Sequence, residues 1–441
     1  MERDSIRCGI SDNFDTFVLL DDCEATAEKP YSRLYTGYVR EIVCTGCNQI
    51  DKVVAEVEDE IRRGLHAIVV ADYEFGAQLQ LQGAHEGKAR FLVFEQCTRL
   101  CKDQVDRWLC QKDGGAATPS LASVTGITPS VSAPEFADAI HSIHESLHAG
   151  DAYQINFTYR LEFDIIGHPI GLYRRLRSRQ PVRYGALISL PTGEWVLSCS
   201  PELFASKGGP LVRCRPMKGT APRSSDLDVD RGAAHFLSTD PKNRAENVMI
   251  VDLLRNDLSR IAEIGTVRTP ELFTIEEYPS VWQMTSTVEA TIRRDCSFAD
   301  ILRALFPCGS ITGAPKHMSM QLIKKLENTP RGIYTGAIGW LEAPPLSDED
   351  RVVSACGDFC LSVAIRTVTV SAPSPSNTRR GRLGVGGGIV LDSHAKDEHA
   401  ETLLKASFLT ETEPMAWVSG NRSSSPSSII ACAPLPASSS G

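Results

Sequence analysis

Three features are scarce or missing in this sequence, and each absence excludes a class of protein. No stretch approaches the roughly 18 consecutive apolar residues that a membrane-spanning helix needs. Residues 1–4, MERD, are charged and begin no apolar signal core, so we expect a cytoplasmic protein. A basic excess is also missing: the net charge is −9, which argues against nucleic-acid binding through a basic surface. An anionic ligand must therefore be met by a few local cations and backbone N–H groups.

The composition that is present is ordinary for a globular protein, with 42 % hydrophobic and 23 % charged residues. A chain of 441 residues can form one large domain or two or three average ones. Its 14 cysteines are scattered, and the chain is too long for a disulfide scaffold. The pairs Cys44–Cys47 and Cys97–Cys101 have spacings that can hold zinc. Reduced thiols, several of them buried, are the favoured interpretation.

Changes in composition divide the chain into four segments. Residues 1–113 form a first part, and residues 114–133 turn to Gly, Ala, Thr, Ser and Pro, which predicts a linker or long loop. Residues 134–410 alternate strand-like and helix-like segments without an internal repeat, which predicts an α+β fold. Residues 411–441 are rich in Ser, Pro and Ala and predict a disordered tail. The third segment opens with apolar residues at helical spacing: Phe136, Ile140, Ile143 and Leu147.

Residues 309–316, GSITGAPK, lead into a helical pattern and form a candidate binding site for an anion. Thr312 is expected to cap that helix, and Pro315 suits its first turn. Free N–H groups at a helix start bind carboxylate or phosphate. The spacing of a P-loop is absent, and taken alone the motif favours a capped turn without a ligand.

Two further features point to close approach of an anion. Gly386, Gly387 and Gly388 let a backbone approach a ligand, although a bulge or tight turn explains them equally well. Arg366 alternates with apolar residues in the run 361–370. Its guanidinium either pairs with an anion or lies on a solvated face.

Three acids and one lysine are candidates for the chemistry. Glu246 follows the helix-start signal at 240–241, and Glu398 and Glu401 share one face of a later helix. Such hard oxygen ligands suit Mg²⁺, although surface glutamates at this spacing are common. Lys218 lies in a glycine-followed turn. Most lysines are solvated, but a desolvated lysine near a cation has a lowered pKa and can act as a nucleophile.

Taken in order, these features resemble the chorismate-binding enzyme family. Its members include the large subunits of anthranilate synthase and aminodeoxychorismate synthase, and the isochorismate and salicylate synthases. The resemblance covers residues 134–409 and implies two large antiparallel sheets packed together and flanked by helices. Six motifs carry it: RPMKGT at 215–220, DPKNRAENVMIVDLLRNDLSR at 240–260, GSITGAPK at 309–316, IRT at 365–367, GGGIVLDS at 386–393 and HAET at 399–402.

The resemblance also implies roles for single residues. Glu246, Glu398 and Glu401 match the family's acids around Mg²⁺, and Glu202 matches its general acid. The positions that match the residues holding the carboxylates of chorismate are Arg366, Tyr334, Thr312, Gly313, Gly386, Gly387 and Gly388.

Three positions favour amination without loss of the pyruvyl group. The isochorismate and salicylate synthases activate water with a lysine where this chain has Gln154, which cannot act as a general base and is expected to contact the substrate instead. Lys218 resembles the lysine of aminodeoxychorismate synthases, where anthranilate synthases have alanine. Gln283 replaces a histidine that anthranilate synthases use in pyruvate elimination. The resemblance therefore implies conversion of chorismate and ammonia to 4-amino-4-deoxychorismate, a step toward 4-aminobenzoate and folate.

Some features depart from the family pattern. The N-terminal part is short and lacks a clear tryptophan-binding motif, and residues 343–350 and 371–380 are local additions. No nucleophile turn of a glutaminase is present, so we expect ammonia from a separate glutamine amidotransferase subunit. Anthranilate synthase and a non-catalytic homologue that binds chorismate or a partner remain the alternatives.

Overall fold

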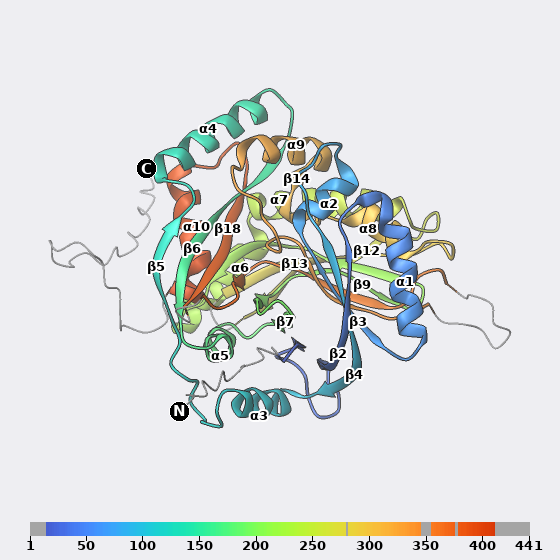
Figure 1. Cartoon of the computed structure of the whole chain (residues 1–441). Helices are drawn as coiled ribbons and strands as arrows, with labels where there is room; N and C mark the ends of the chain where they lie inside the picture. Colours follow the sequence, from blue (N-terminus) through green and yellow to red (C-terminus); the bar gives the residue numbers. More distant parts are fainter. Residues whose placement is uncertain (1–14, 279–280, 345–353, 375–377, 411–441) are drawn as a thin grey trace, which may run out of the picture.

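The computed structural model describes residues 15–278, 281–344, 354–374 and 378–410 (Figure 1). Its strands are β1 Phe17–Asp21, β2 Ser32–Cys44, β3 His66–Ala71, β4 Ala89–Leu100, β5 Ser123–Pro129, β6 Gln154–Ile166, β7 Tyr184–Ser189, β8 Trp195–Ser200, β9 Leu203–Gly208, β10 Leu211–Arg215, β11 Met217–Pro222, β12 Arg268–Glu277, β13 Val281–Thr291, β14 Gly313–Ala314, β15 Ala337–Leu341, β16 Phe359–Val363, β17 Thr367–Val370 and β18 Arg379–Ile389. Its helices are α1 Ile50–Arg62, α2 Tyr73–Gln80, α3 Lys102–Lys112, α4 Ala133–His148, α5 Pro169–Arg179, α6 Leu227–Thr239, α7 Pro241–Ser259, α8 Phe298–Leu305, α9 Lys316–Leu326 and α10 Ala395–Thr410, with short 3₁₀ turns η1 Cys47–Gln49 and η2 Gly309–Ile311.

Hydrogen bonds link the described strands into one continuous antiparallel sheet. Its order is β12–β13–β10–β9–β16–β15–β3–β4–β2–β1–β7–β8–β17–β18–β6–β5, with β11 also on β13 and β14 also on β6. The α+β class is confirmed. The packed sheets implied by the family resemblance correspond here to stretches of this continuous sheet, which are joined through β2, β1 and β7.

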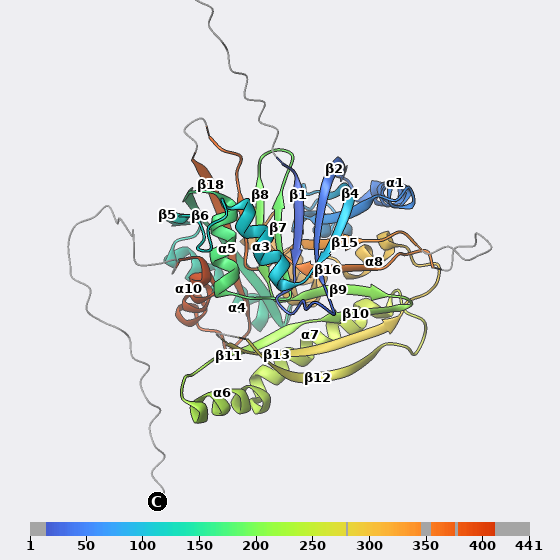
Figure 2. The ribbon, with the colours of Figure 1, turned by 90° about the horizontal axis from the view of Figure 1, so that it is seen from below.

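Helices cover the sheet in two groups. Helices α1, α2, α7 and α8 enclose one apolar core with strands such as β3, β4 and β9. A second core lies between β6, β8 and β18 and helices that include α3, α4, α5 and α10. Figure 2 shows α1 and α8 on one side of the molecule and α4, α5 and α10 on the other. A third, smaller core is formed by strand residues, among them Tyr35, Ile68, Ile188 and Ile338.

The helix predicted after residue 133 is confirmed as α4. Ser132 accepts a hydrogen bond from the Glu135 N–H, and the Glu135 carboxylate accepts one from the Ser132 N–H, which forms a capping box. Its predicted apolar face, Phe136, Ile140, Ile143 and Leu147, is buried.

The segment predicted as a linker, 114–133, contains β5, which pairs with β6. Strand β1 pairs with β7 and β3 pairs with β15, so the N-terminal strands share the sheet with the later ones. The predicted tail, 411–441, lies outside the described residues. Within the described ranges, no helix has the length and apolar character needed to cross a membrane.

Candidate active site

Strand β6 is the element around which the candidate site is built. Its first two residues pair with β14 on one side. On the other side β18 pairs along its length, with Gly388 opposite Asn156. Figure 1 shows β18 and β6 running together beside α10. The sheet therefore brings the motifs at 309–316 and 386–388 to either side of one strand.

Lys218 and Gln154 meet over Gly388. A Cβ atom on Gly388 would lie 2.6 Å from Lys218 Nζ and 2.9 Å from the Gln154 side-chain amide, so glycine is needed to leave room for both groups. Gln154 is fully buried, and its amide oxygen and nitrogen have no hydrogen-bond partner among the described residues. Because a buried amide without a partner is costly, it marks a place for a ligand.

Lys218 lies within β11 and not in the predicted turn, at a register shift against β13 that Gln283 holds in place. The Gln283 amide accepts a hydrogen bond from the Thr220 hydroxyl at 3.1 Å and donates one to the Gly219 carbonyl at 2.9 Å. Gly219 has φ of +93°, a conformation that glycine adopts without strain. Burial lowers the pKa of the Lys218 ammonium, and the neighbouring Glu246 carboxylate opposes this only in part. The neutral, nucleophilic amine is thereby favoured.

Glu202 lies in the turn between β8 and β9 and is 3 % exposed. The Ser310 hydroxyl donates a hydrogen bond to Glu202 Oε1 at 2.6 Å. Burial raises the pKa of the Glu202 carboxyl to about 7, although the Ser310 hydrogen bond and the Lys218 ammonium act in the opposite direction. A carboxyl that titrates near neutrality can both donate and accept a proton there.

Arg366 lies between β16 and β17 with φ of +49°, a conformation that non-glycine residues rarely adopt. Its carbonyl accepts a hydrogen bond from the Cys199 N–H at 3.0 Å. Burial lowers the pKa of the Arg366 guanidinium, and Cys199, Tyr278 and Glu202 counteract this. Strained backbone of this kind occurs often at ligand sites, where it aims a side chain.

Two of the three predicted metal ligands share α10. Glu398 and Glu401 lie about one turn apart. Burial raises the pKa of Glu398, and the nearby Glu401 and Glu246 carboxylates add to the rise. Burial also acts to raise the pKa of Glu401, but the adjacent Lys405 outweighs it and holds that pKa below the ordinary value.

Lys405 connects this acidic cluster to the glycine motif. Its ammonium pairs with Glu401 at 2.7 Å and donates a hydrogen bond to the Gly386 carbonyl at 2.9 Å. A Cβ on Gly387 would lie 3.3 Å from Glu398 Oε2 and 3.5 Å from Lys405 Nζ. In the part of the chain that the structure describes, no three Asp, Glu, His or Cys side chains are grouped closely enough to hold a metal by themselves.

The helix start predicted at Thr312 is wrong. The N-cap of α9 is Pro315, with φ of −68° and ψ of 141°, and no side chain caps the helix. The Thr312 hydroxyl donates instead to the Gly309 carbonyl at 3.1 Å. The physical reason is Gly313, which has φ of +138° and enters β14, so that pairing with β6 keeps the chain extended before the helix.

Tyr334 lies in the turn before β15, and its ring packs against β18 beside the glycine motif. A Cβ on Gly384 would lie 2.1 Å from the Tyr334 ring, so the ring packs directly on that glycine. The Arg160 guanidinium is 5.3 Å from the centroid of the same ring. Burial raises the pKa of Tyr334 to about 12. Its predicted contact with a substrate carboxylate stays a prediction.

Ser310 and Lys405 were not among the predicted site residues. Ser310 lies inside the GSITGAPK motif, but its contact with Glu202 spans more than 100 residues and has no local signal. Lys405 follows Glu401 by four residues, a spacing that indicates a helical ion pair.

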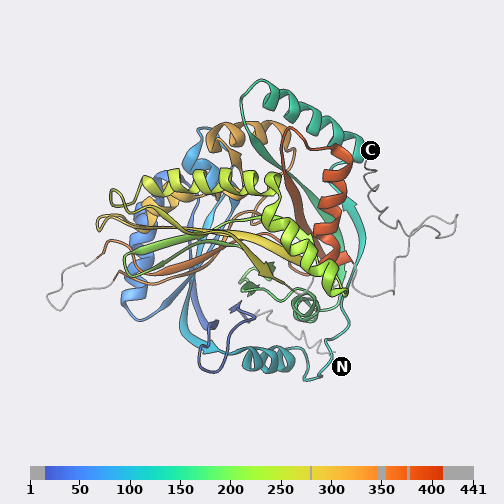
Figure 3. The same cartoon turned by 180° about the vertical axis from the view of Figure 1, so that it is seen from behind.

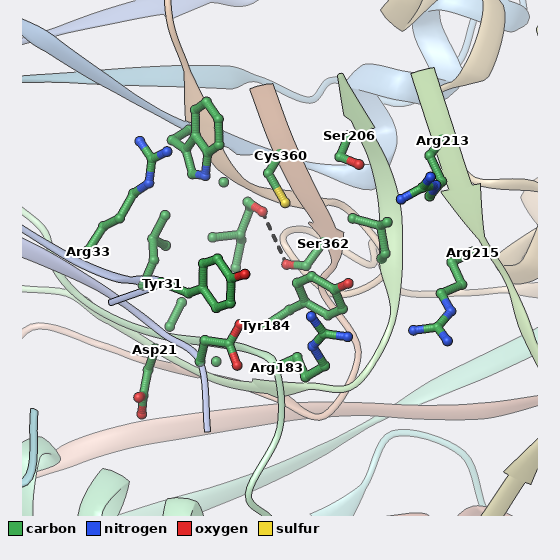
Figure 4. Close-up of a pocket in the computed structure, with 18 of the residues that line it drawn as sticks. Asp21, Tyr31, Arg33, Arg183, Tyr184, Ser206, Arg213, Arg215, Cys360 and Ser362 are labelled. Carbon is green, nitrogen blue, oxygen red and sulfur yellow. Dashed lines mark hydrogen bonds between the residues drawn. The ribbon is translucent and has the colours of Figure 1, made fainter. Parts of the chain in front are cut away.

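A separate pocket of about 560 Å³ opens beside β1, β7, β9 and β16 (Figure 4). Among its lining residues are Arg33, Arg183 and Trp340, and the Arg33 guanidinium stacks 3.6 Å from the centre of the Trp340 ring. None of the predicted catalytic, substrate-binding or metal-binding residues lines it. The candidate site at β6 and β18 is therefore distinct from this cavity.

Comparison with known proteins assigns the family. The sequence pattern of the family described as chorismate binding enzyme matches residues 16–411, which is most of the chain. The chain belongs to the chorismate-binding enzyme family.

Among solved structures, an isochorismate synthase of Bacillus anthracis is 21 % identical with a TM-score of 0.68, over 90 % of this chain and 95 % of that one. Anthranilate synthase component I of Streptococcus pneumoniae is 23 % identical with a TM-score of 0.65, over 93 % and 95 %. At such identities these likenesses show the fold.

Curated relatives share more of the sequence. Aminodeoxychorismate synthase component 1 of Salmonella typhimurium is 36 % identical over 68 % of this chain and 62 % of its own length. The Klebsiella aerogenes protein of the same name is 40 % identical over 66 % and 60 %. Anthranilate synthase component 1 of Streptomyces coelicolor is 37 % identical over 66 % and 53 %. The chain thus spans about 60 % or less of the length of these relatives.

Proposed function

We propose that this chain is the large, aminating subunit of an aminodeoxychorismate synthase, which converts chorismate and ammonia to 4-amino-4-deoxychorismate. The observation that carries the proposal is the amine of Lys218, held over Gly388 beside the unpaired Gln154 amide, with its pKa lowered by burial. Relatives named aminodeoxychorismate synthase component 1, at 36 % and 40 % identity, support it.

In the first step, the neutral amine of Lys218 attacks C2 of chorismate. Both conjugated ring double bonds shift by one position, and the hydroxyl leaves C4 as water with a proton from Glu202. The burial that raises the pKa of Glu202 to about 7 keeps that carboxyl protonated often enough to serve as the acid. Arg366 is proposed to pair with a carboxylate of the substrate, because a guanidinium forks onto a carboxylate.

In the second step, ammonia adds to C4, both double bonds shift back, and the Lys218 amine leaves C2. The Glu202 carboxylate takes up the proton that ammonia loses, so both groups regain their starting forms. The net change is replacement of the C4 hydroxyl by an amino group with release of water. The enolpyruvyl group stays on the ring because Gln283, which is fixed by Gly219 and Thr220, has no group to transfer protons for its elimination near neutral pH.

The acidic cluster fits Mg²⁺ as part of a ligand set. Mg²⁺ binds through one or two carboxylates and completes its shell with waters and ligand oxygens, and Glu398 and Glu401 offer such a pair on α10, with Glu246 close by. When bound, the ion supplies positive charge that binds a substrate carboxylate. The residues that would hold it are Glu398, Glu401 and Glu246.

We further propose that the chain acts in the cytoplasm and receives ammonia from a separate glutamine amidotransferase subunit. The name component 1, carried by the relatives, supports a partner subunit. With purified partner present, glutamine should replace ammonium as the nitrogen source.

Pyruvate release tests the proposal against the anthranilate alternative. The purified chain is mixed with chorismate, Mg²⁺ and excess ammonium, and pyruvate is followed with lactate dehydrogenase and NADH. We expect chorismate to disappear without equivalent pyruvate. One pyruvate released for each chorismate consumed would replace the proposal with anthranilate synthesis, and binding without consumption, with the amidotransferase also present, would indicate a non-catalytic homologue.

A further inference from the structure

A buried cluster of charged residues lies behind the candidate site. Arg331, 3 % exposed, forms a two-pronged ion pair with Glu327: Nε donates at 2.9 Å and Nη2 at 2.7 Å. The Tyr73 ring lies under the guanidinium, 4.2 Å from its centroid. Glu327 also accepts hydrogen bonds from the N–H and the hydroxyl of Thr158 on β6, at 2.9 and 3.0 Å.

The remaining N–H groups of Arg331 reach two main-chain carbonyls. Nη1 donates to the Ile311 carbonyl at 2.8 Å, and Nη2 donates to the Asn156 carbonyl at 2.7 Å. Ile311 immediately precedes the turn of Thr312 and Gly313, and Asn156 lies on β6 opposite Gly388. One guanidinium thus ties together the two backbone segments that flank the candidate site.

Asn156 reinforces the same junction. Its side-chain amide donates to the Ile311 carbonyl at 3.0 Å, and its N–H donates to the Thr312 carbonyl at 2.9 Å. The main chain of the cluster is also fixed, because Glu74 accepts the N–H groups of Arg331 and Gly332 at 2.6 and 2.9 Å. This holds the loop that leads to Tyr334.

We propose that Arg331 is a positioning residue for chorismate binding, which sets the distance between the Thr312–Gly313 turn and β6 without touching the ligand. The inference rests on the function proposed above, since it assigns the ligand of the same site. Arginine is required because its planar fork serves one carboxylate and two carbonyls at once, whereas the ammonium of lysine is a single point. The chemistry itself belongs to Lys218, on β11, and Glu202, in the turn between β8 and β9.

Arg331→Lys separates this role from a merely structural one. Since small misplacements of binding groups cost up to about 100-fold, we expect the Kd and KM for chorismate to rise about 10- to 100-fold, with kcat within a factor of about 3. Binding is measured by calorimetry with chorismate and Mg²⁺ in the absence of any nitrogen source, so that the result does not depend on the product formed.

Arg174→Lys is the matched control. Arg174 pairs with Asp113 at 2.6 Å and donates to the Ala117 carbonyl at 2.8 Å, and neither partner belongs to the candidate site. The Arg174→Lys substitution should lower the melting temperature without changing the Kd for chorismate. If Arg331→Lys does not fold, Glu327→Gln, which removes the charge and keeps the shape, is measured with the same expectation.

The positioning role is overturned if a folded Arg331 or Glu327 variant has a lower melting temperature but binds chorismate with wild-type affinity. Failure of the proposed function looks different: the wild-type chain would bind chorismate in the calorimeter, and Arg331→Lys would weaken that binding, while no 4-amino-4-deoxychorismate formed.

Discussion

Replacing Glu202 with glutamine tests the acid that the structure assigns to the leaving hydroxyl. The substitution keeps the shape of the side chain and an oxygen for the Ser310 hydroxyl, which donates to Oε1 at 2.6 Å. It removes the proton that a carboxylic acid supplies, because an amide does not act as an acid near neutral pH. The expected loss therefore lies in kcat and leaves the KM for chorismate largely unchanged.

The size and the pH dependence of the effect follow from the buried environment. A positioned general acid contributes about 10²- to 10⁴-fold, or about 3 to 5 kcal/mol of transition-state stabilisation. With the pKa of Glu202 raised to about 7, the acid form is lost as the pH rises through that value. Wild-type kcat should thus fall about tenfold for each pH unit above it. Loss of the Lys218 proton should raise kcat, and it occurs at a lower pH than for an ordinary lysine because burial lowers the Lys218 pKa.

The assay is chorismate consumption with saturating ammonia across the pH range, for wild type and Glu202→Gln. Glu58→Gln is the control, because Glu58 is also a buried carboxyl whose pKa burial raises, but it lies on α1 away from the site. The control should keep the wild-type profile. A Glu202→Gln variant that retains kcat within about threefold, or that still shows the alkaline limb, would refute the assignment of Glu202 as the acid.

Three further substitutions probe the same site. Lys218→Ala removes the nucleophile, so kcat for amination, measured by rapid-mix kinetics, should fall at least about 10³-fold. Chorismate binding, measured by calorimetry, should be retained. Amination at the wild-type rate would exclude a covalent role for Lys218. Gly388→Ala places a Cβ 2.6 Å from Lys218 Nζ and 2.9 Å from the Gln154 amide, which are the ends of flexible side chains and can shift. We therefore expect a loss of no more than about 1 kcal/mol in unfolding free energy and a lower kcat, because the amine is displaced. Denaturant unfolding and a rate assay check the two values, and an unchanged kcat would contradict the packing. Lys405→Met removes the ammonium that pairs with the partly exposed Glu401 at 2.7 Å and competes with a metal for that carboxylate. Calorimetry should therefore show Mg²⁺ binding up to about 5-fold tighter. Weaker binding would mean that Lys405 supports the metal site rather than competing with it.

The parts of the fold and site that the sequence predicted are those with a local signal. The start of α7 at Asp240 and Pro241 is confirmed, because Asp240 accepts the Asn243 N–H at 2.8 Å. The α4 face was readable from its helical spacing. The helix start at Thr312 was wrong because tertiary pairing of β14 with β6 overrides the local capping pattern.

Contacts between distant segments had no such signal. One such contact is the Ser310–Glu202 hydrogen bond. Another is the pair of hydrogen bonds from Arg331 to the carbonyls of Ile311 and Asn156. Both depend on how the sheet brings separate motifs together. A sequence motif identifies candidate site residues. Three-dimensional packing decides which other residues contact them, shift their pKa values or fix their backbone.

The most direct test of the central claim is the identity of the product formed from chorismate, Mg²⁺ and isotopically labelled ammonium, followed by chromatography with mass detection. The account predicts a product that carries the label in place of the C4 hydroxyl, retains the enolpyruvyl group and is lost in Lys218→Ala. Labelled anthranilate with free pyruvate, formed equally well by Lys218→Ala, would contradict it.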